Sequence, residues 1–336
     1  GVELFKKLAS MKPVNAIMTI GGQDEYSSSS GSLATRPDIL GSFNLGCIYR
    51  DGIGVEQDYK ESLKWFKVAS EKGHPMSTCN VGAYYMNGWG TEKDYDKAFE
   101  YTKKAADQGF AVAQYNLATV YELGLGVEKN REKSLFWLEK AADNGHTRSQ
   151  RAMGEYLLTG MYGIKKNPEK AFKYFTLASE KGDLFARKSL GICHLRGYGV
   201  KPDSEKAISI FKELIKKPYE PSKNPRKAVF YYDDSRTFER VEIDEYRPDA
   251  LAAFNLGIIY RTGDGVKQDY EKAIECFERA IKSGHMLARA NLGEMLIKGK
   301  GTAVDLKRGI KLTKMAAESG ISYAQYNMYL SYLCGL

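Results

Sequence analysis

The chain has 336 residues, of which 43% are hydrophobic and 27% are charged, and its formal net charge is +8. This composition is typical of folded proteins and excludes a disordered or low-complexity chain. No apolar run approaches the ~18 residues that a membrane-spanning helix needs. Basic and acidic residues interleave along the chain rather than forming the basic stripe that binds nucleic acid.

Residues 1–37 are predicted to hold the end of a repeat helix followed by a hairpin-like insert. Gly1–Leu8 is similar to Ile208–Leu214, which is predicted to end a helix further along the chain. Asn15–Ile20 then has the composition of a strand, and two glycines and a serine-rich stretch follow it. This order predicts a strand and a turn.

From residue 38 onward one cassette recurs. In it, a helix containing Asn44-Leu45-Gly46 leads to a Gly-x-Gly turn, to Asp58 and to a second helix that ends at Gly73-His74. A period of this length indicates an array of identical supersecondary units. The Asn44 position recurs after steps of 36 (80−44), 36, 36, 37, 66, 36 and 36 residues, at Asn80, Asn116, Ala152, Ser189, Asn255, Asn291 and Asn327.

Each cassette predicts a pair of helices. In the third one, apolar and small residues recur at three- and four-residue spacing from Ala113 to Tyr121, as on one face of an amphipathic helix. Gly124 ends that helix because glycine accepts the left-handed conformation, and the second helix closes at Gly145. A residue that can bond orphan backbone amides precedes every second helix. These predicted caps are Asp58, Asp94, Asn130, Asn167, Asp203, Asp269 and Asp305.

The 66-residue step contains a second insert, residues 217–248. Lys227–Tyr232, a polar tetrapeptide and Thr237–Ile243 follow one another as strand, turn and strand, which predicts a β-hairpin. Its aromatic residues are typical of binding hot spots, and packing of the hairpin over adjacent repeats explains them equally well. We predict partner contacts for Phe230, Tyr231, Tyr232 and Phe238.

The predicted fold is therefore an all-α, superhelical α/α solenoid of about eight helical-hairpin repeats, interrupted by two β-hairpin-like insertions. Repeats one to five occupy residues 38–216, and repeats six to eight occupy residues 249–336. Because Tyr332–Gly335 matches the end of a first helix, both termini lie inside a repeat. We therefore expect the sequence to be a fragment of a longer protein.

The cassette closely resembles the Sel-one-like repeat family, which is related to the tetratricopeptide repeats. The pattern A-x-x-N-L-G-x-x-Y-x-x-G-x-G-V-x-x-D-x-x-K-A-x-x-W-F-x-x-A-A-x-x-G-H carries the resemblance, at Phe43–His74, Ala113–His146 and Ala252–His285. The resemblance implies an adaptor or scaffold that organises protein complexes. The chain departs from the pattern at Tyr162, which is an extra residue in the fourth turn.

Six of the eight first helices keep an asparagine in mid-helix, although asparagine is a mediocre helix former. Its amide could bond the backbone of a neighbouring helix, or it could face the groove and hold the backbone of a bound peptide. In the second case, the residue four positions earlier shares its face. The predicted groove residues are Asn44, Asn80, Asn116, Asn255, Asn291, Asn327, Met76, Phe185 and Tyr323.

No catalytic residue, metal site or cofactor is predicted. His74, His146 and His285 share one cassette position, which favours capping or packing over metal binding. Lys298–Thr302 lacks the glycine spacing and the preceding strand of a phosphate loop. The five cysteines occupy unmatched cassette positions, so we interpret them as buried apolar residues in a reducing compartment. The expected location is the cytoplasm, or a host cytosol after delivery.

The sequence as a whole predicts a non-catalytic interaction scaffold or adaptor. It would bind a partner protein or peptide in the concave groove of the solenoid, assisted by the hairpins. Two alternatives remain at this stage: a regulatory repeat array of a larger enzyme, and an inhibitor or immunity protein that occludes an enzyme.

Overall fold

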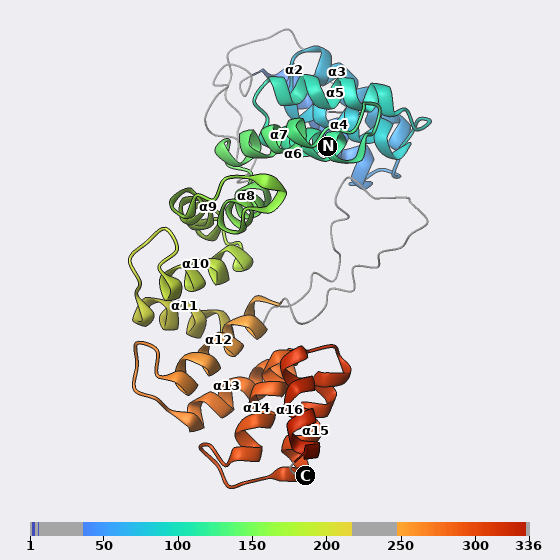
Figure 1. The fold of residues 1–336 in the computed structure, drawn as a ribbon. Coiled ribbons are helices and arrows are strands. Elements are labelled where there is room, and N and C mark those ends of the chain that lie inside the picture. The colour runs from blue at the N-terminus through green and yellow to red at the C-terminus, as the bar shows by residue number, and fades with distance from the viewer. Residues whose placement is uncertain (1, 4–5, 7–35, 217–246, 334–336) are drawn as a thin grey trace. The chain divides into compact units, whose positions relative to one another are not determined.

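The computed structural model describes residues 2–3, 6, 36–216 and 247–333 (Figure 1). Within these ranges the chain forms 15 α-helices and one short 3-10 helix, η1, and it contains no β-strand. The predicted fold class, an all-α solenoid of helical hairpins, is confirmed. The two predicted β-hairpin insertions, residues 7–35 and 217–246 for the most part, lie outside the described residues. None of the described helices has the length and apolarity needed to cross a membrane.

The described residues up to Ser149 form one compact unit, and those from Gln150 onward form another. Even-numbered helices are the first helices of the cassettes, and odd-numbered helices are the second ones. The first unit contains α2 (Pro37–Asp51), α3 (Tyr59–Glu71), α4 (Pro75–Asn87), α5 (Tyr95–Asp107), α6 (Ala111–Leu123) and α7 (Arg131–Asp143). Consecutive helices pack against one another throughout this unit.

The division between the units falls inside α8 (Thr147–Thr159). The second unit continues with η1 (Met161–Gly163), α9 (Pro168–Glu180), α10 (Leu184–Arg196), α11 (Ser204–Lys216), α12 (Pro248–Thr262), α13 (Tyr270–Lys282), α14 (Met286–Lys298), α15 (Leu306–Glu318) and α16 (Ser322–Leu333). From α9 to α16 each helix packs against the next, and α12 follows α11 directly in this order.

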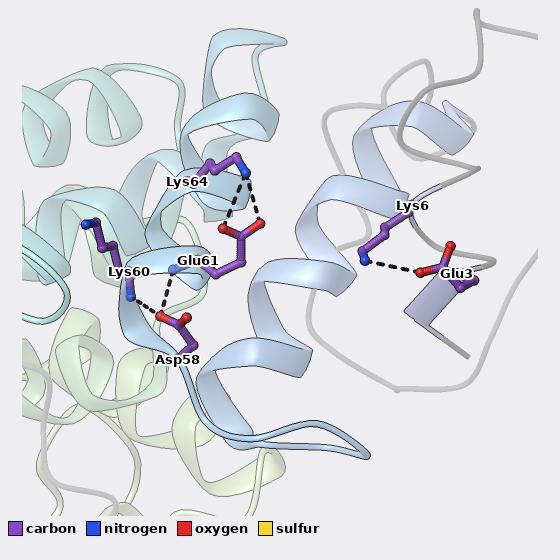
Figure 2. A network of polar contacts seen from close by, with 6 residues as sticks. All are labelled: Glu3, Lys6, Asp58, Lys60, Glu61 and Lys64. Carbon is purple, nitrogen blue, oxygen red and sulfur yellow. Dashed lines mark hydrogen bonds and ion pairs between the residues drawn. The ribbon is translucent and has the colours of Figure 1, made fainter.

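All seven predicted helix caps are confirmed. Figure 2 shows the first of them, where the Oδ1 atom of Asp58 accepts hydrogen bonds of 2.9 Å from the backbone amides of Lys60 and Glu61. The same figure shows Lys64 bonded to Glu61 one turn further on, and the separate ion pair of Lys6 with Glu3. The remaining caps accept the amide three residues later: Asp94, Asn130, Asn167, Asp203, Asp269 and Asp305.

A small residue on each first helix from α2 to α14 lets the second helix of the same repeat approach closely. A Cβ atom added at Gly46 would lie 2.5 Å from the ring of Phe66, and one at Gly257 would lie 2.6 Å from the ring of Phe277. Both rings are fully buried. Across the repeats this small residue falls two positions after the asparagine position, at Gly46, Gly82, Ala118, Gly154, Gly191, Gly257 and Gly293.

The turn between the helices of the fourth repeat carries the extra residue noted in the sequence. Tyr162 has a φ of 57°, the one positive φ among the non-glycine residues that the structure describes. It lies in η1, and its ring packs edge-on against Tyr156 at 4.9 Å between centroids. A positive φ is energetically unfavourable for a tyrosine, and the ring contact with Tyr156 helps to offset this cost.

Candidate partner-binding face

The first helices leave one row of side chains accessible, four residues before the asparagine position. In the first unit Leu40 and Met76 are half-buried and Val112 is 39% exposed. In the second unit Phe185 and Leu251 are half-buried. Leu287 and Tyr323 are 37% and 41% exposed. Together with the asparagine position, we call this row the first-helix face.

Along α2, α4 and α6 the first-helix face is almost free of charge, whereas α8 carries the exposed Arg148 at the same cassette position. Helix α4 contains no charged residue. In α2 the carboxylate of Asp38 is buried and ion-paired, and Arg50 pairs with Asp51 at 2.7 Å at the end of the helix. Glu122 is the one charged residue of α6. Uncharged apolar side chains beside amides suit a peptide better than a phosphate or a sugar.

In the second unit a polar network ties three first helices together. Glu294 on α14 accepts from Lys298 at 2.6 Å and pairs with Arg261 of α12 at 3.4 Å. The hydroxyl of Tyr323 on α16 also donates to this carboxylate. Sequence reasoning placed Tyr323 in the groove but did not detect this network, because the three partners come from three different repeats.

The six predicted asparagines do not share one environment. Asn116 is 4% exposed and Asn291 is 6% exposed, so both are buried. The Nδ2 atom of Asn116 contacts the Sγ atom of Cys79 on α4 at 3.4 Å. Asn255 and Asn291 donate to the carbonyl four residues earlier in their own helices, at 2.9 and 2.8 Å.

The other asparagines, Asn44, Asn80 and Asn327, are half-buried. Met76 and Phe185 are half-buried as well, and Tyr323 is exposed at the first-helix face. Partner binding by these nine residues stays a prediction. The structure adds a division in burial among the asparagines, because Asn116 and Asn291 are buried whereas Asn44, Asn80, Asn255 and Asn327 are half-buried.

This division gives a stability prediction. Asn116→Ala removes a buried donor and its packing between α4 and α6, so we expect the free energy of unfolding to fall by about 1 to 2 kcal/mol. Asn80→Ala removes a half-buried amide at the same cassette position, and we expect a loss below about 0.5 kcal/mol. Urea denaturation followed by circular dichroism measures both. Equal losses in the two variants would contradict the division.

The three repeated histidines cap first helices, which confirms the structural interpretation. The Nδ1 atom of His74 accepts from the backbone amide of Ser77 at 3.2 Å, and that of His285 accepts from the amide of Ala288 at 3.3 Å. His146 makes the same contact with the amide of Ser149 at 3.3 Å. Each ring also packs on an aromatic residue of the preceding first helix: Phe43, Tyr115 and Phe254.

In the fourth repeat an ion pair replaces this aromatic stack. Arg151 stands where Phe43 stands in the first repeat, and Asp183 stands where His74 stands. The Nη1 atom of Arg151 lies 3.4 Å from the Oδ2 atom of Asp183, which caps α10 through the amide of Ala186. The sequence analysis considered each cassette position separately. It therefore missed that the aromatic residue and the histidine are replaced together, which indicates that the two positions are in contact.

The remaining chemistry-bearing residues show no assembled site. No group of three or more histidine, cysteine, aspartate or glutamate residues could hold a metal ion in the described ranges. His194 is buried edge-on against Phe172, with ring centroids 5.4 Å apart. Burial raises the pKa of Cys79 to about 12, so its thiol is inert at neutral pH. Phe230, Tyr231, Tyr232 and Phe238 lie outside the described residues.

The fold and the first-helix face define a helical-repeat protein, and the comparison with family models identifies its class. The Sel1 repeat model matches residues 40–74, 75–110, 111–146, 147–183, 186–217, 220–233, 250–285 and 287–321. The chain belongs to the Sel1 repeat family. Proteins of this family are generally protein–protein interaction scaffolds and generally non-catalytic.

Two solved structures share the fold. A protective antigen of uropathogenic Escherichia coli that displays an SLR fold is 24% identical, has a TM-score of 0.69, and aligns over 88% of this chain and 57% of its own. A Sel1 repeat protein from Oxalobacter formigenes is also 24% identical, has a TM-score of 0.61, and aligns over 84% of this chain and 99% of its own. At this identity the similarity shows the fold.

Curated relatives match shorter stretches. Chitin synthase regulatory factor 3 of Schizosaccharomyces pombe is 26% identical over 132 residues, which are 39% of this chain and 11% of that protein. A sel1-like repeat-containing protein of Acanthamoeba polyphaga mimivirus is 39% identical over 70 residues, which are 20% of this chain and 13% of that protein. The matched regions thus span little more than a tenth of each relative.

Proposed function

We propose that this chain is a non-catalytic scaffold that binds a segment of a partner protein along its first-helix face. The observation that carries the proposal is the row of accessible apolar side chains four residues before the asparagine position. Accessible apolar side chains that recur with the repeat offer a partner an equivalent contact in seven of the eight cassettes, the fourth carrying Arg148 instead. Membership of the Sel1 repeat family supports the same function.

The charge distribution supports partner binding at the first-helix face rather than at the surface formed by the second helices. Second helices carry interleaved lysine and glutamate residues, as in α13 with Glu271, Lys272, Glu275, Glu278 and Arg279. Such surfaces are solvated and contribute little to binding. On α2, α4 and α6 the positions of the first-helix face carry the neutral side chains of Leu40, Met76 and Val112 instead. Apolar contacts of that kind dominate the centres of protein interfaces.

The experiment is quantitative affinity purification with mass spectrometry, using the wild-type chain and two double variants. One double variant introduces two carboxylates on the first-helix face of the first unit, by Met76→Asp and Val112→Asp. The other introduces two on that of the second unit, by Phe185→Asp and Leu287→Asp. We expect at least one pair to reduce recovery of the partner by about tenfold. Phe136→Asp is the matched control, because Phe136 is 52% exposed on a second helix.

Thermal melting of each variant separates loss of binding from loss of folding. The four substituted residues are at least partly accessible, so we expect melting temperatures within about 4 °C of wild type. Unchanged recovery of the partner with both double variants would refute binding along the first-helix face. Assistance by Phe230, Tyr231, Tyr232 and Phe238, and a cytoplasmic location, stay predictions that this experiment does not address.

A further inference from the structure

Helix α10 carries more positive charge than any other first helix that the structure describes. It contains Arg187, Lys188 and Arg196 and no acidic residue, which gives a net charge of +3 (3−0). None of the other described first helices exceeds +1. Arg187 pairs with Glu213 of α11. Lys188 and Arg196 make no ion pair with any described residue, so their charge is not neutralised in this part of the chain.

Lys188 differs from Arg196 because it is half-buried. Arg196 is exposed at the end of α10, where a cation complements the helix dipole. Phe185, Lys188 and Ile192 follow one another at three- and four-residue spacing, so they lie on one face of α10. All three are half-buried. Since Phe185 belongs to the first-helix face, Lys188 is placed on the same side of the helix as that face.

A second cation lies beside Lys188. The guanidinium of Arg151 on α8 stacks on the ring of Phe185, with 4.8 Å between Cζ and the ring centroid, and pairs with Asp183 at 3.4 Å. Burial lowers the pKa of Lys188, and the charge of Arg151 lowers it further. Glu155 and Asp183 oppose this shift of the pKa, but neither carboxylate forms an ion pair with Lys188.

The packing scheme of the cassette does not supply an anionic partner for Lys188. At this cassette position three other first helices carry an aromatic ring that packs on a capping histidine: Phe43, Tyr115 and Phe254. In the repeat that starts with α12 the cap follows 31 residues later (285−254). The same offset from Lys188 leads to Tyr219, which has no carboxylate and lies outside the described residues. A half-buried ammonium group without an acceptor lowers stability, and such residues are typical of functional sites.

We propose that Lys188, with Arg151 beside it, binds the carboxylate of an aspartate or glutamate in the partner segment that lies along the first-helix face. The inference rests on the proposed function and adds that the segment is acidic at this point. Apolar residues would flank the carboxylate, because Phe185 and Ile192 lie one turn to either side of Lys188. Helix α12, which contacts α10, continues the apolar row with Leu251. In a partly desolvated site a charge pair contributes more than on an open surface.

The probe is a phage-displayed library of random peptides of about twelve residues, selected at about 0.15 M salt on the full chain and its variants. We expect the wild type to enrich peptides that combine apolar residues with aspartate or glutamate. Lys188→Met should abolish the acidic preference, and Lys188→Glu should replace it with a preference for lysine or arginine. Loss of folding cannot produce such a reversal. The charge-matched control is Lys173→Met, which removes an exposed lysine of α9 and should enrich the same peptides as the wild type.

The affinities of individual peptides measure the ion pair itself. The most enriched peptide is compared with a counterpart in which asparagine or glutamine replaces each acidic residue, by fluorescence anisotropy. Lys188→Met should weaken binding of the acidic peptide about tenfold and that of the neutral counterpart less than about twofold. This comparison is a double-mutant cycle, which separates the ion pair from the other effects of the substitution.

Thermal melting distinguishes a binding role of Lys188 from a structural one. Lys188→Met keeps an unbranched apolar side chain but removes a half-buried charge that has no acceptor. We therefore expect its melting temperature to rise by about 2 °C or more. A lysine that stabilises the fold would give a change of the opposite sign. Lys173→Met should melt within about 1 °C of the wild type, because Lys173 is exposed.

Three results would overturn the proposal. The first is the absence of an acidic preference in the wild type, or the same preference in Lys188→Met, which would assign it to the general positive charge of the chain. The second is a lower melting temperature of Lys188→Met, which would mean that the ammonium has a structural partner within the chain. Both leave binding along the first-helix face intact. The third is a selection that yields no peptide weakened by Phe185→Asp with Leu287→Asp, which would refute the proposed function as well.

Discussion

Gly126→Ala is expected to destabilise the protein by about 2 to 5 kcal/mol. Gly126 has a φ of 65°, a left-handed conformation that costs an L-residue about 1 to 2 kcal/mol. A Cβ atom there would also lie 2.1 Å from the carbonyl oxygen of Tyr95, at the start of the preceding second helix. The carbonyl group of Tyr95 belongs to the backbone and cannot move out of the way by changing a side-chain rotamer. The turn or α5 must therefore shift to relieve the clash, at a further cost of about 1 to 3 kcal/mol.

Gly54 provides the matched control. It holds the same place in the first turn, with a φ of 71°, but no atom lies within 4 Å of its added Cβ. Gly54→Ala should therefore cost only the conformational part, about 1 to 2 kcal/mol. Urea denaturation of both variants measures the difference. Equal losses of stability in the two variants would mean that these glycines are needed only for their left-handed backbone conformation. The close contact of Gly126 with Tyr95 would then not set the spacing between repeats.

Acidification between pH 6.5 and 4 is expected to destabilise the protein through His74 and His285. Burial lowers the pKa of each imidazole from 6.5 to about 4. Each Nδ1 atom accepts a backbone amide and must therefore be unprotonated in the folded state. The unfolded state binds a proton below pH 6.5 and the folded state does not. The stabilisation is thus complete above pH 6.5 and is lost as the pH falls towards 4.

Each histidine should contribute a slope of about 1.4 kcal/mol per pH unit within this interval, or about 3 kcal/mol over its full width. His74→Asn and His285→Asn keep a capping side chain that does not titrate in this range. Each should lower stability at pH 7, because the ring packing is lost, but should flatten the dependence on pH. Urea midpoints at five pH values test this, and an unchanged slope in the double variant would disprove the assignment.

Much of this fold could be predicted from the sequence because its determinants are local. The cap at Asp58 and the turn glycine Gly124 act within a few residues of their own positions, so residue type and spacing are enough to predict them. The repeat period then places every helix from α2 to α16 in register. The β-hairpin prediction falls on residues outside the described ranges, and the structure does not test it.

The candidate site could be predicted in part. Helical spacing predicts the same cassette position for Met76 and Tyr323, since positions four apart share a helix face. In their respective units Met76 is half-buried and Tyr323 is 41% exposed, and their role in binding stays a prediction. Helical spacing could not tell that Asn116 is buried and Asn80 is half-buried, although both hold the same cassette position. That difference depends on side chains from neighbouring helices, such as Cys79 beside Asn116.

The sequence by itself thus determined the repeat, its helix starts and its turns, because hydrogen-bond caps and left-handed glycines act over a few residues. Only the tertiary structure decided which side chains remain accessible. It showed that Glu294 joins three helices and that Gly46 and Gly257 each face a buried phenylalanine ring. These features depend on contacts between different helices, and their energetic effect depends on the distance between packed helices.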